Sequence, residues 1–162
     1  MYNSQTNIQN PGAFIKIITI IYIALITGLL LFGTTAFFIT ENKGVKMSPA
    51  GDPFFYIAPL LVIAGGISGA FLFKMAVSKL ANIQTLKEKL QGYQTALILR
   101  AALSEGPSLF AIVCFLLTGN SYYLIVAGFN VLYLISFIPT KNKLEDDLNL
   151  SYEDKIAMET NN

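Results

Sequence analysis

The chain has 162 residues, of which 54% are hydrophobic and 13% are charged, and its net charge is +1. Soluble domains carry about 25% charged residues, so this composition indicates a membrane protein, and the small net charge excludes a nucleic-acid binder, which needs a strongly basic surface. There is no histidine and one cysteine, Cys114, so a histidine-ligated metal or haem, a Cys–His nucleophile and an intramolecular disulfide are all excluded.

Four apolar segments are candidates for membrane spans. A helix needs about 20 mostly apolar residues to cross the hydrocarbon core of a bilayer. The segments lie at about residues 17–39, 53–75, 97–118 and 121–139. The first contains no charge and is too long for the apolar region of a signal peptide, and the fourth is shorter and ends at Pro139. We therefore predict an all-α fold in which residues 1–140 form a four-transmembrane-helix bundle.

The lysine residues predict the orientation of this bundle. Four lysines lie from the end of the second span to the start of the third: Lys74, Lys79, Lys87 and Lys89. The loop between the first two spans has only two lysines, offset by two acidic residues. Cytoplasmic loops carry the excess of lysine and arginine, so both termini are expected to be cytoplasmic. The small size favours a bacterial inner membrane, with the lipid bilayer as the expected partner.

The segments outside the predicted spans show helical spacing before the third span and an acidic composition after the fourth. Leu86, Leu90, Tyr93 and Leu97 recur at spacings of three and four, which predicts that the third helix continues beyond the membrane as a helical cytoplasmic hairpin extension. Residues 141–162 contain six acidic and three basic side chains. We predict an acidic, polar cytoplasmic tail there, with room for a short helix.

The second span carries small residues at a regular spacing. Gly65 and Gly69 form a GxxxG pair, and Gly66 and Ala70 repeat that spacing one residue along. Such a face lets the backbone of another helix approach closely and gain van der Waals contact. We therefore predict a close hairpin of the second and third spans, with these four residues as its packing face.

The third span contains two charged residues. Arg100 lies near its cytoplasmic end, and we expect its side chain to reach the interface as an anchor. Glu105 lies eight residues after Leu97, about 12 Å deeper at 1.5 Å per residue. Ionising a carboxyl in a span costs about 2.5–3.5 kcal/mol, and neutralising it at pH 7 costs about 3.7 kcal/mol. Because the two costs are similar, local partners decide its protonation.

Polar residues at a similar depth are candidate partners of this carboxyl. Asn130 in the fourth span matches the depth of Glu105 within about one helical turn, so we predict that the two side chains approach each other across the bundle. Ser104 and Ser108 supply hydroxyl groups beside it. Glu105, Asn130, Ser104 and Ser108 are therefore the candidate ion-binding residues. No metal site and no cofactor is predicted.

Residues 61–118 resemble the helical hairpin of the rotor-ring c subunits of rotary ATP synthases. The resemblance rests on the glycine run "IAGGISGAFLF" and on the carboxylate in "ALSEGPSLF". It implies that Glu105 binds a proton and that Gly65, Gly66 and Gly69 pack neighbouring copies in a ring. The second span lacks the glutamine of the sodium-binding variant, so the resemblance implies a proton rather than sodium. The family's Arg-Gln-Pro loop is also missing.

Two functions stay open from the sequence. In the first, the protein handles protons or another cation through Glu105, alone or as a homo-oligomer. In the second, it is a scaffold or accessory subunit of a membrane complex, and Glu105 and Asn130 fix the register of the helices. A membrane enzyme is disfavoured, because no second acid or base lies in the predicted core, and we predict no enzymatic activity.

Overall fold

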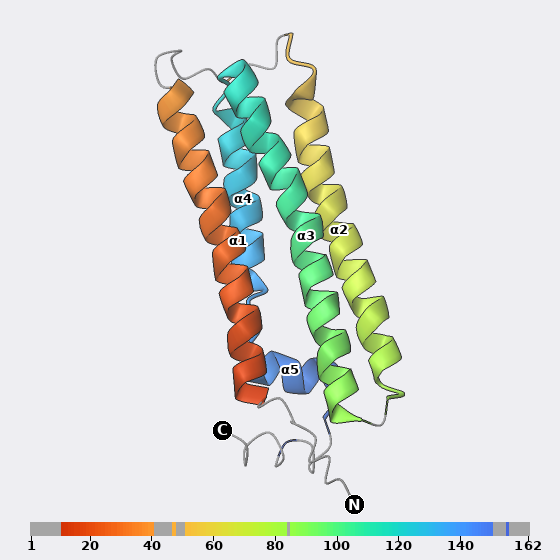
Figure 1. Cartoon of the computed structure of the whole chain (residues 1–162). Coiled ribbons are helices and arrows are strands. Elements are labelled where there is room, and N and C mark those ends of the chain that lie inside the picture. The colour runs from red at the N-terminus through yellow and green to blue at the C-terminus, as the bar shows by residue number, and fades with distance from the viewer. Residues whose placement is uncertain (1–10, 41–46, 48–50, 84, 151–154, 156–162) are drawn as a thin grey trace, which may run out of the picture.

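The computed structural model describes residues 11–40, 47, 51–83, 85–150 and 155 (Figure 1). This part of the chain is helical and contains no strand. Its helices are α1 (Pro11–Thr40), α2 (Phe54–Leu80), α3 (Leu86–Thr118), α4 (Tyr122–Ser136) and α5 (Lys141–Leu148). The predicted all-α fold is confirmed.

Three of the helices are long and apolar enough to cross a membrane. The qualifying segments are Phe14–Thr40, Ile57–Leu80 and Leu86–Thr118. α4 has 15 residues, which is shorter than the other three. It qualifies as a span only together with α5, from which it is bent by 75°. The described chain therefore has three candidate spans, or four if α4 and α5 form one bent span.

Proline explains why α4 is shorter than its apolar sequence. The apolar run continues through Phe137 and Ile138, but the helix ends at Ser136. Pro139 has no N–H to continue the hydrogen-bond ladder, and its ring disfavours the helical conformation of the residue before it. The helical part of the predicted fourth span is thus about 22 Å long at 1.5 Å per residue, less than the hydrocarbon thickness of about 30 Å.

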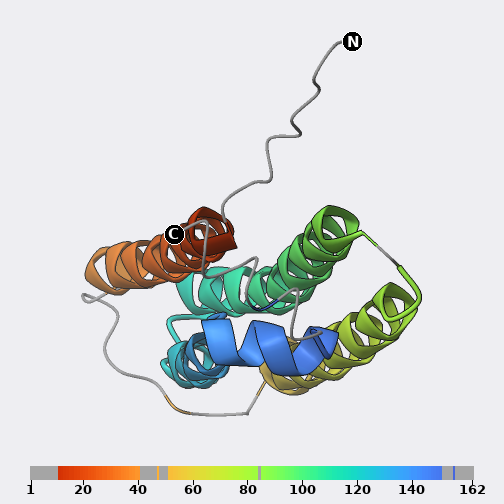
Figure 2. The same ribbon diagram turned by 90° about the horizontal axis from the view of Figure 1, so that it is seen from below.

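α3 is the central helix of the bundle. It packs most extensively on α2, and also on α4 and α1, as the two views in Figures 1 and 2 show. It is continuous from Leu86 to Thr118, in agreement with the helical spacing of its first turns. Leu90, Tyr93 and Leu97 on those turns are buried. This position makes α3 the element on which the polar residues of the other helices converge.

α5 lies across one end of the bundle (Figure 2). Leu144 and Leu148, four residues apart, are buried against the bundle, and the hydroxyl of Tyr93 donates a hydrogen bond to Asp147 at 2.7 Å. Thr140 caps the helix by accepting a hydrogen bond from the N–H of Lys143. The first part of the predicted polar tail is therefore a packed helix, and residues 151–154 and 156–162 lie outside the described residues.

Gly65 lies at the closest approach of α2 and α3. A Cβ at this position would overlap the carbonyl oxygen of Leu103 and would lie 2.9 Å from the ring of Pro107. Pro107 has no N–H, so the carbonyl of Leu103, four residues earlier, loses its helical partner, and that same carbonyl faces Gly65. One turn further along α2, a Cβ on Gly69 would lie 3.3 Å from the carbonyl oxygen of Arg100.

Candidate functional site: polar residues between the helices

Asn130 joins α4 to α3 through two hydrogen bonds. Its side-chain amide donates to the carbonyl oxygen of Ser104 and to the hydroxyl of Ser108, at 2.6 Å each. All three residues are buried, because Ser104 and Ser108 lie four residues apart on the face of α3 that meets α4. We call Ser104, Ser108 and Asn130 the asparagine cluster. Both N–H groups of the amide are used within it, so the cluster ties the two helices together.

Glu105 lies outside this cluster. One residue along a helix is a rotation of about 100°, so Glu105 points away from the face that Ser104 presents to α4. Its side chain is half-buried and has no hydrogen bond or ion pair within the described chain. The predicted approach of Glu105 and Asn130 is replaced by a bond between Asn130 and the residue before Glu105.

Two contacts of α3 with α1 locate Glu105 on the bundle. The hydroxyl of Tyr22 in α1 donates to the carbonyl oxygen of Leu97 at 3.1 Å. Ile112 approaches Gly33 of α1, where a Cβ would lie 3.7 Å from its Cδ1. Residues seven apart lie on nearly the same helix face, so Glu105 shares the face of Ile112. It therefore lies on the α1 flank of α3, at a height between these two contacts.

Arg100, predicted to reach toward the interface, instead packs between α2 and α4. Its guanidinium carbon lies 3.4 Å from the ring centre of Phe137 and 5.1 Å from that of Phe73. One guanidinium nitrogen donates to the hydroxyl of Tyr133 at 3.4 Å, and that hydroxyl donates in turn to the carbonyl of Gly66 at 3.2 Å. The Nε of Arg100 is buried and has no acceptor among the described residues. We call Arg100 with these three rings the arginine cage.

The opposite end of the bundle holds a polar cluster that the sequence analysis did not single out. Asp52 accepts a hydrogen bond from the N–H of Phe54 at 3.0 Å and one from the side chain of Asn120 at 3.5 Å. Asn120 also accepts from the N–H of Tyr122 at 3.2 Å. An asparagine next to a turn glycine is the signal that points to such capping. These bonds link the start of α2 to the turn between α3 and α4.

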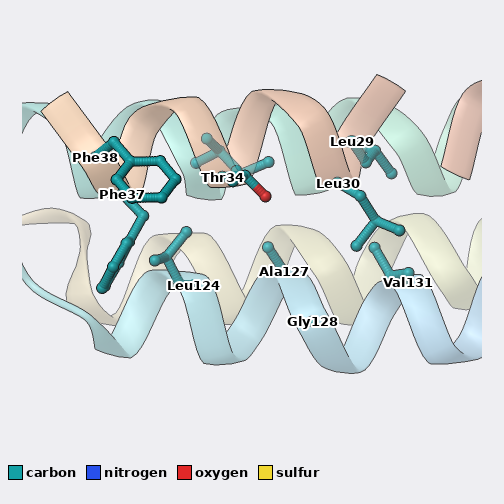
Figure 3. A pocket seen from close by; sticks show the side chains of 11 residues that line it. Leu29, Leu30, Thr34, Phe37, Phe38, Leu124, Ala127, Gly128 and Val131 are labelled. Carbon is teal, nitrogen blue, oxygen red and sulfur yellow. The ribbon is translucent and has the colours of Figure 1, made fainter. Parts of the chain in front are cut away.

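An apolar groove separates α1 from α4. Figure 3 shows Leu30 and Phe37 of α1 reaching toward α4, beside Val131 and Leu124. The groove has a volume of about 310 Å³, and no charged residue lines it. Its lining residues are Leu29, Leu30, Gly33, Thr34, Phe37, Phe38, Ile112, Leu124, Ala127, Gly128 and Val131. Thr34 contributes the only polar side chain of this lining, so the groove has no carboxylate for an ion.

Comparisons with known proteins give no relative. No protein family, no curated protein and no solved structure matches the chain. The resemblance of residues 61–118 to rotor-ring c subunits therefore stays a prediction. In the part of the chain that the structure describes, no group of three or more His, Cys, Asp or Glu residues lies close enough to hold a metal ion.

Proposed function

We propose that the protein is a non-catalytic accessory or scaffold subunit of a membrane complex. In this proposal α4 and the turn that follows it form a short fourth span, and both termini lie on the cytoplasmic side of a bacterial inner membrane. The observation that supports the role is the separation of the four candidate ion-binding residues. Three of them bond to one another, and Glu105 makes no bond within the described chain.

The asparagine cluster favours a structural role over an ion site. Asn130 bonds Ser104 and Ser108 at 2.6 Å, and all three side chains are buried. Bonds of this kind between membrane helices contribute about 0.6 kcal/mol on average and up to about 1.7 kcal/mol. An ion would have to displace them and would find no carboxylate among the three residues. The cluster therefore fixes the packing of α3 on α4.

Glu105 supplies the contact to a partner. A carboxyl inside the membrane is costly when it is ionised and unpaired, and such residues normally mark a functional contact. The side chain is half-buried on the α1 flank of α3 and makes no bond within the described chain. A membrane helix of another protein with an arginine, a lysine or a hydrogen-bond donor at that depth would satisfy it. This is the chemistry that we assign to the partner.

Proton handling is the second candidate, and it rests on the same exposed side of Glu105. A carboxyl at the edge of a bundle, on a helix packed closely against a glycine-rich neighbour, is the arrangement that the c-subunit resemblance implies. In this role the partner is a second copy of the chain. The two candidates therefore differ in what contacts the α1 flank of α3.

Photo-cross-linking in native membranes tests the proposal. A photoreactive residue replaces Leu109, which lies one turn after Glu105 and is 37% exposed. We expect a cross-link to a different membrane protein, and we expect the Glu105→Ala substitution to reduce it at least fivefold. A photoreactive residue at Leu117 is the matched control. Leu117 is 68% exposed and lies about 120° around the helix from Glu105, so its cross-links should not change with the Glu105→Ala substitution.

A hydrophobic carbodiimide, which modifies protonated carboxyls in lipid, separates the two candidates. A cross-link only to a second copy, together with selective labelling of Glu105 in native membranes at neutral pH, would favour proton handling. No Glu105-dependent cross-link and no labelling at any pH would overturn both roles of this carboxyl. The Glu105→Gln variant controls for labelling at other carboxyls.

A further inference from the structure

A second groove lies between α2 and α4. Its volume is about 390 Å³, within the range of about 300–1,000 Å³ that is typical of ligand sites. The groove is open toward the surface of the bundle, where Ile67 and Phe129 are 66% and 69% exposed. Its lining residues are Val62, Ile63, Gly66, Ile67, Ala70, Phe129, Asn130 and Tyr133. The lining is therefore mostly apolar and suits a hydrocarbon chain.

The arginine cage lies one turn beyond one end of this groove. Tyr133 belongs both to the lining of the groove and to the cage, where its hydroxyl accepts a hydrogen bond from Arg100. One turn further along, Phe73 of α2 and Phe137, the first residue after α4, pack on the guanidinium of Arg100. The amine of Lys143 in α5 lies 6.0 Å from the ring centre of Phe137. Two cationic groups thus gather around one ring at the end of an apolar groove.

Neither cation is neutralised by an acidic side chain of the described chain. The ion pairs in this region join Lys141 and Lys155 to Glu145. Lys143 donates to the backbone carbonyl of Ser136 at 2.7 Å, and the buried Nε of Arg100 has no acceptor among the residues described. A buried donor without an acceptor costs about 1–3 kcal/mol. An anionic group with several acceptor oxygens is complementary to these two cations.

We propose that the α2–α4 groove binds an anionic phospholipid, with an acyl chain along the groove and the phosphate at Arg100 and Lys143. Arginine and lysine are the side chains that bind phosphate, arginine through its planar fork and lysine as a point charge. The orientation proposed above places this end of the bundle in the cytoplasmic leaflet, whose anionic lipids attract juxtamembrane cations. The choice of leaflet is the only part that rests on the proposed function.

The α1–α4 groove of Figure 3 is an internal comparison. It is similar in volume, at about 310 Å³, and neither groove has a charged residue in its lining, but no residue of the arginine cage lines the α1–α4 groove. A lipid chain in that groove would not share a lining residue with a caged cation, as it does through Tyr133 in the α2–α4 groove. We therefore expect headgroup selectivity only at the α2–α4 groove.

Native mass spectrometry of the purified full-length protein in detergent tests the proposal. Phosphatidylglycerol and phosphatidylcholine with identical chains are the two probes. We expect one phosphatidylglycerol to bind in preference to phosphatidylcholine, and the Lys143→Gln substitution to weaken its binding about fivefold, the effect of losing roughly one juxtamembrane charge. Lys143 is exposed, so this variant should fold normally.

Two further variants keep the test specific. Lys87→Gln removes an exposed lysine from the first turn of α3 and should leave binding unchanged. Ala70→Leu fills the groove and should weaken the binding of both lipids while keeping the headgroup preference. Equal binding of the two lipids, or equal effects of Lys143→Gln and Lys87→Gln, would overturn the proposal. None of these outcomes depends on Glu105, so the proposed function is tested separately.

Discussion

The two flanks of α3 use polar residues in different ways. On the side of α2 and α4, the Leu103 carbonyl that Pro107 leaves unpaired faces Gly65, and Asn130 bonds Ser104 and Ser108. On the side of α1, the hydroxyl of Tyr22 donates a hydrogen bond to the carbonyl oxygen of Leu97. Glu105 lies on that flank without a bond to any described residue.

Neighbours in the sequence therefore have different roles. Ser104 and Glu105 are adjacent, but a rotation of about 100° separates a buried helix contact from a carboxyl at the edge of the bundle. On the flank toward α2 and α4, the amide of Asn130 is bonded within the chain, and Gly65 allows α2 to approach α3 closely. On the flank toward α1, the carboxyl of Glu105 has no hydrogen-bond partner among the described residues, and we expect a partner protein to bind there.

The largest effect is expected at Gly65. The Gly65→Ala substitution places a Cβ against the Leu103 carbonyl and 2.9 Å from the ring of Pro107, and backbone atoms cannot move aside as a flexible side chain can. We expect a loss of about 1–3 kcal/mol in the free energy of unfolding, measured by denaturation in mixed micelles.

Gly28→Ala is the control at an exposed glycine of α1. Nothing lies within 4 Å of a Cβ at Gly28 in α1. Alanine is the better helix former, so stability should be unchanged or raised by up to about 1 kcal/mol. Equal destabilisation by the two substitutions would show that the loss at Gly65 does not come from its close approach to α3.

A smaller effect is expected in the asparagine cluster. Asn130→Ala removes two hydrogen bonds between α3 and α4, and Ser108→Ala removes one partner of the amide. A double-mutant cycle should give a coupling free energy of about 0.6–1.7 kcal/mol. The hydroxyl of Ser78 bonds only the carbonyl of Met75 in its own helix, so pairing Ser78→Ala with Asn130→Ala should give no coupling. No coupling between Asn130 and Ser108 would mean that the cluster does not tie the helices.

Some of this arrangement could be predicted from the sequence. Apolar runs and helical spacing are local signals, so the helices and the continuation of α3 from Leu86 follow from them. The spacing of Gly65 and Gly69 likewise indicates a close helix contact, although it does not name the carbonyl of Leu103 as the atom approached.

Other features depend on which residues meet in space. The rings of the arginine cage come from other parts of the chain: Phe73 from α2, Tyr133 from α4 and Phe137 from the residue after α4. The sequence of α3 alone therefore predicts that the side chain of Arg100 extends to the membrane interface. Matching depth suggested that Asn130 meets Glu105, but depth along a span does not give the rotation of the helix about its axis. That rotation brings Ser104 to Asn130 instead.

The smallest effect is expected at Glu105. In detergent micelles the isolated protein has no partner helix, and the carboxyl makes no bond within the described chain. Gln keeps the size and polarity of the side chain and cannot ionise, so Glu105→Gln should change the free energy of unfolding by less than about 0.5 kcal/mol. Denaturation in the same micelles as for Asn130→Ala checks this. If Glu105→Gln destabilised the protein more than Asn130→Ala, Glu105 would have a partner within its own bundle. The carboxyl on the α1 flank would then be bonded within the chain, as the amide of Asn130 is on the flank toward α2 and α4. No binding partner would be needed to explain it.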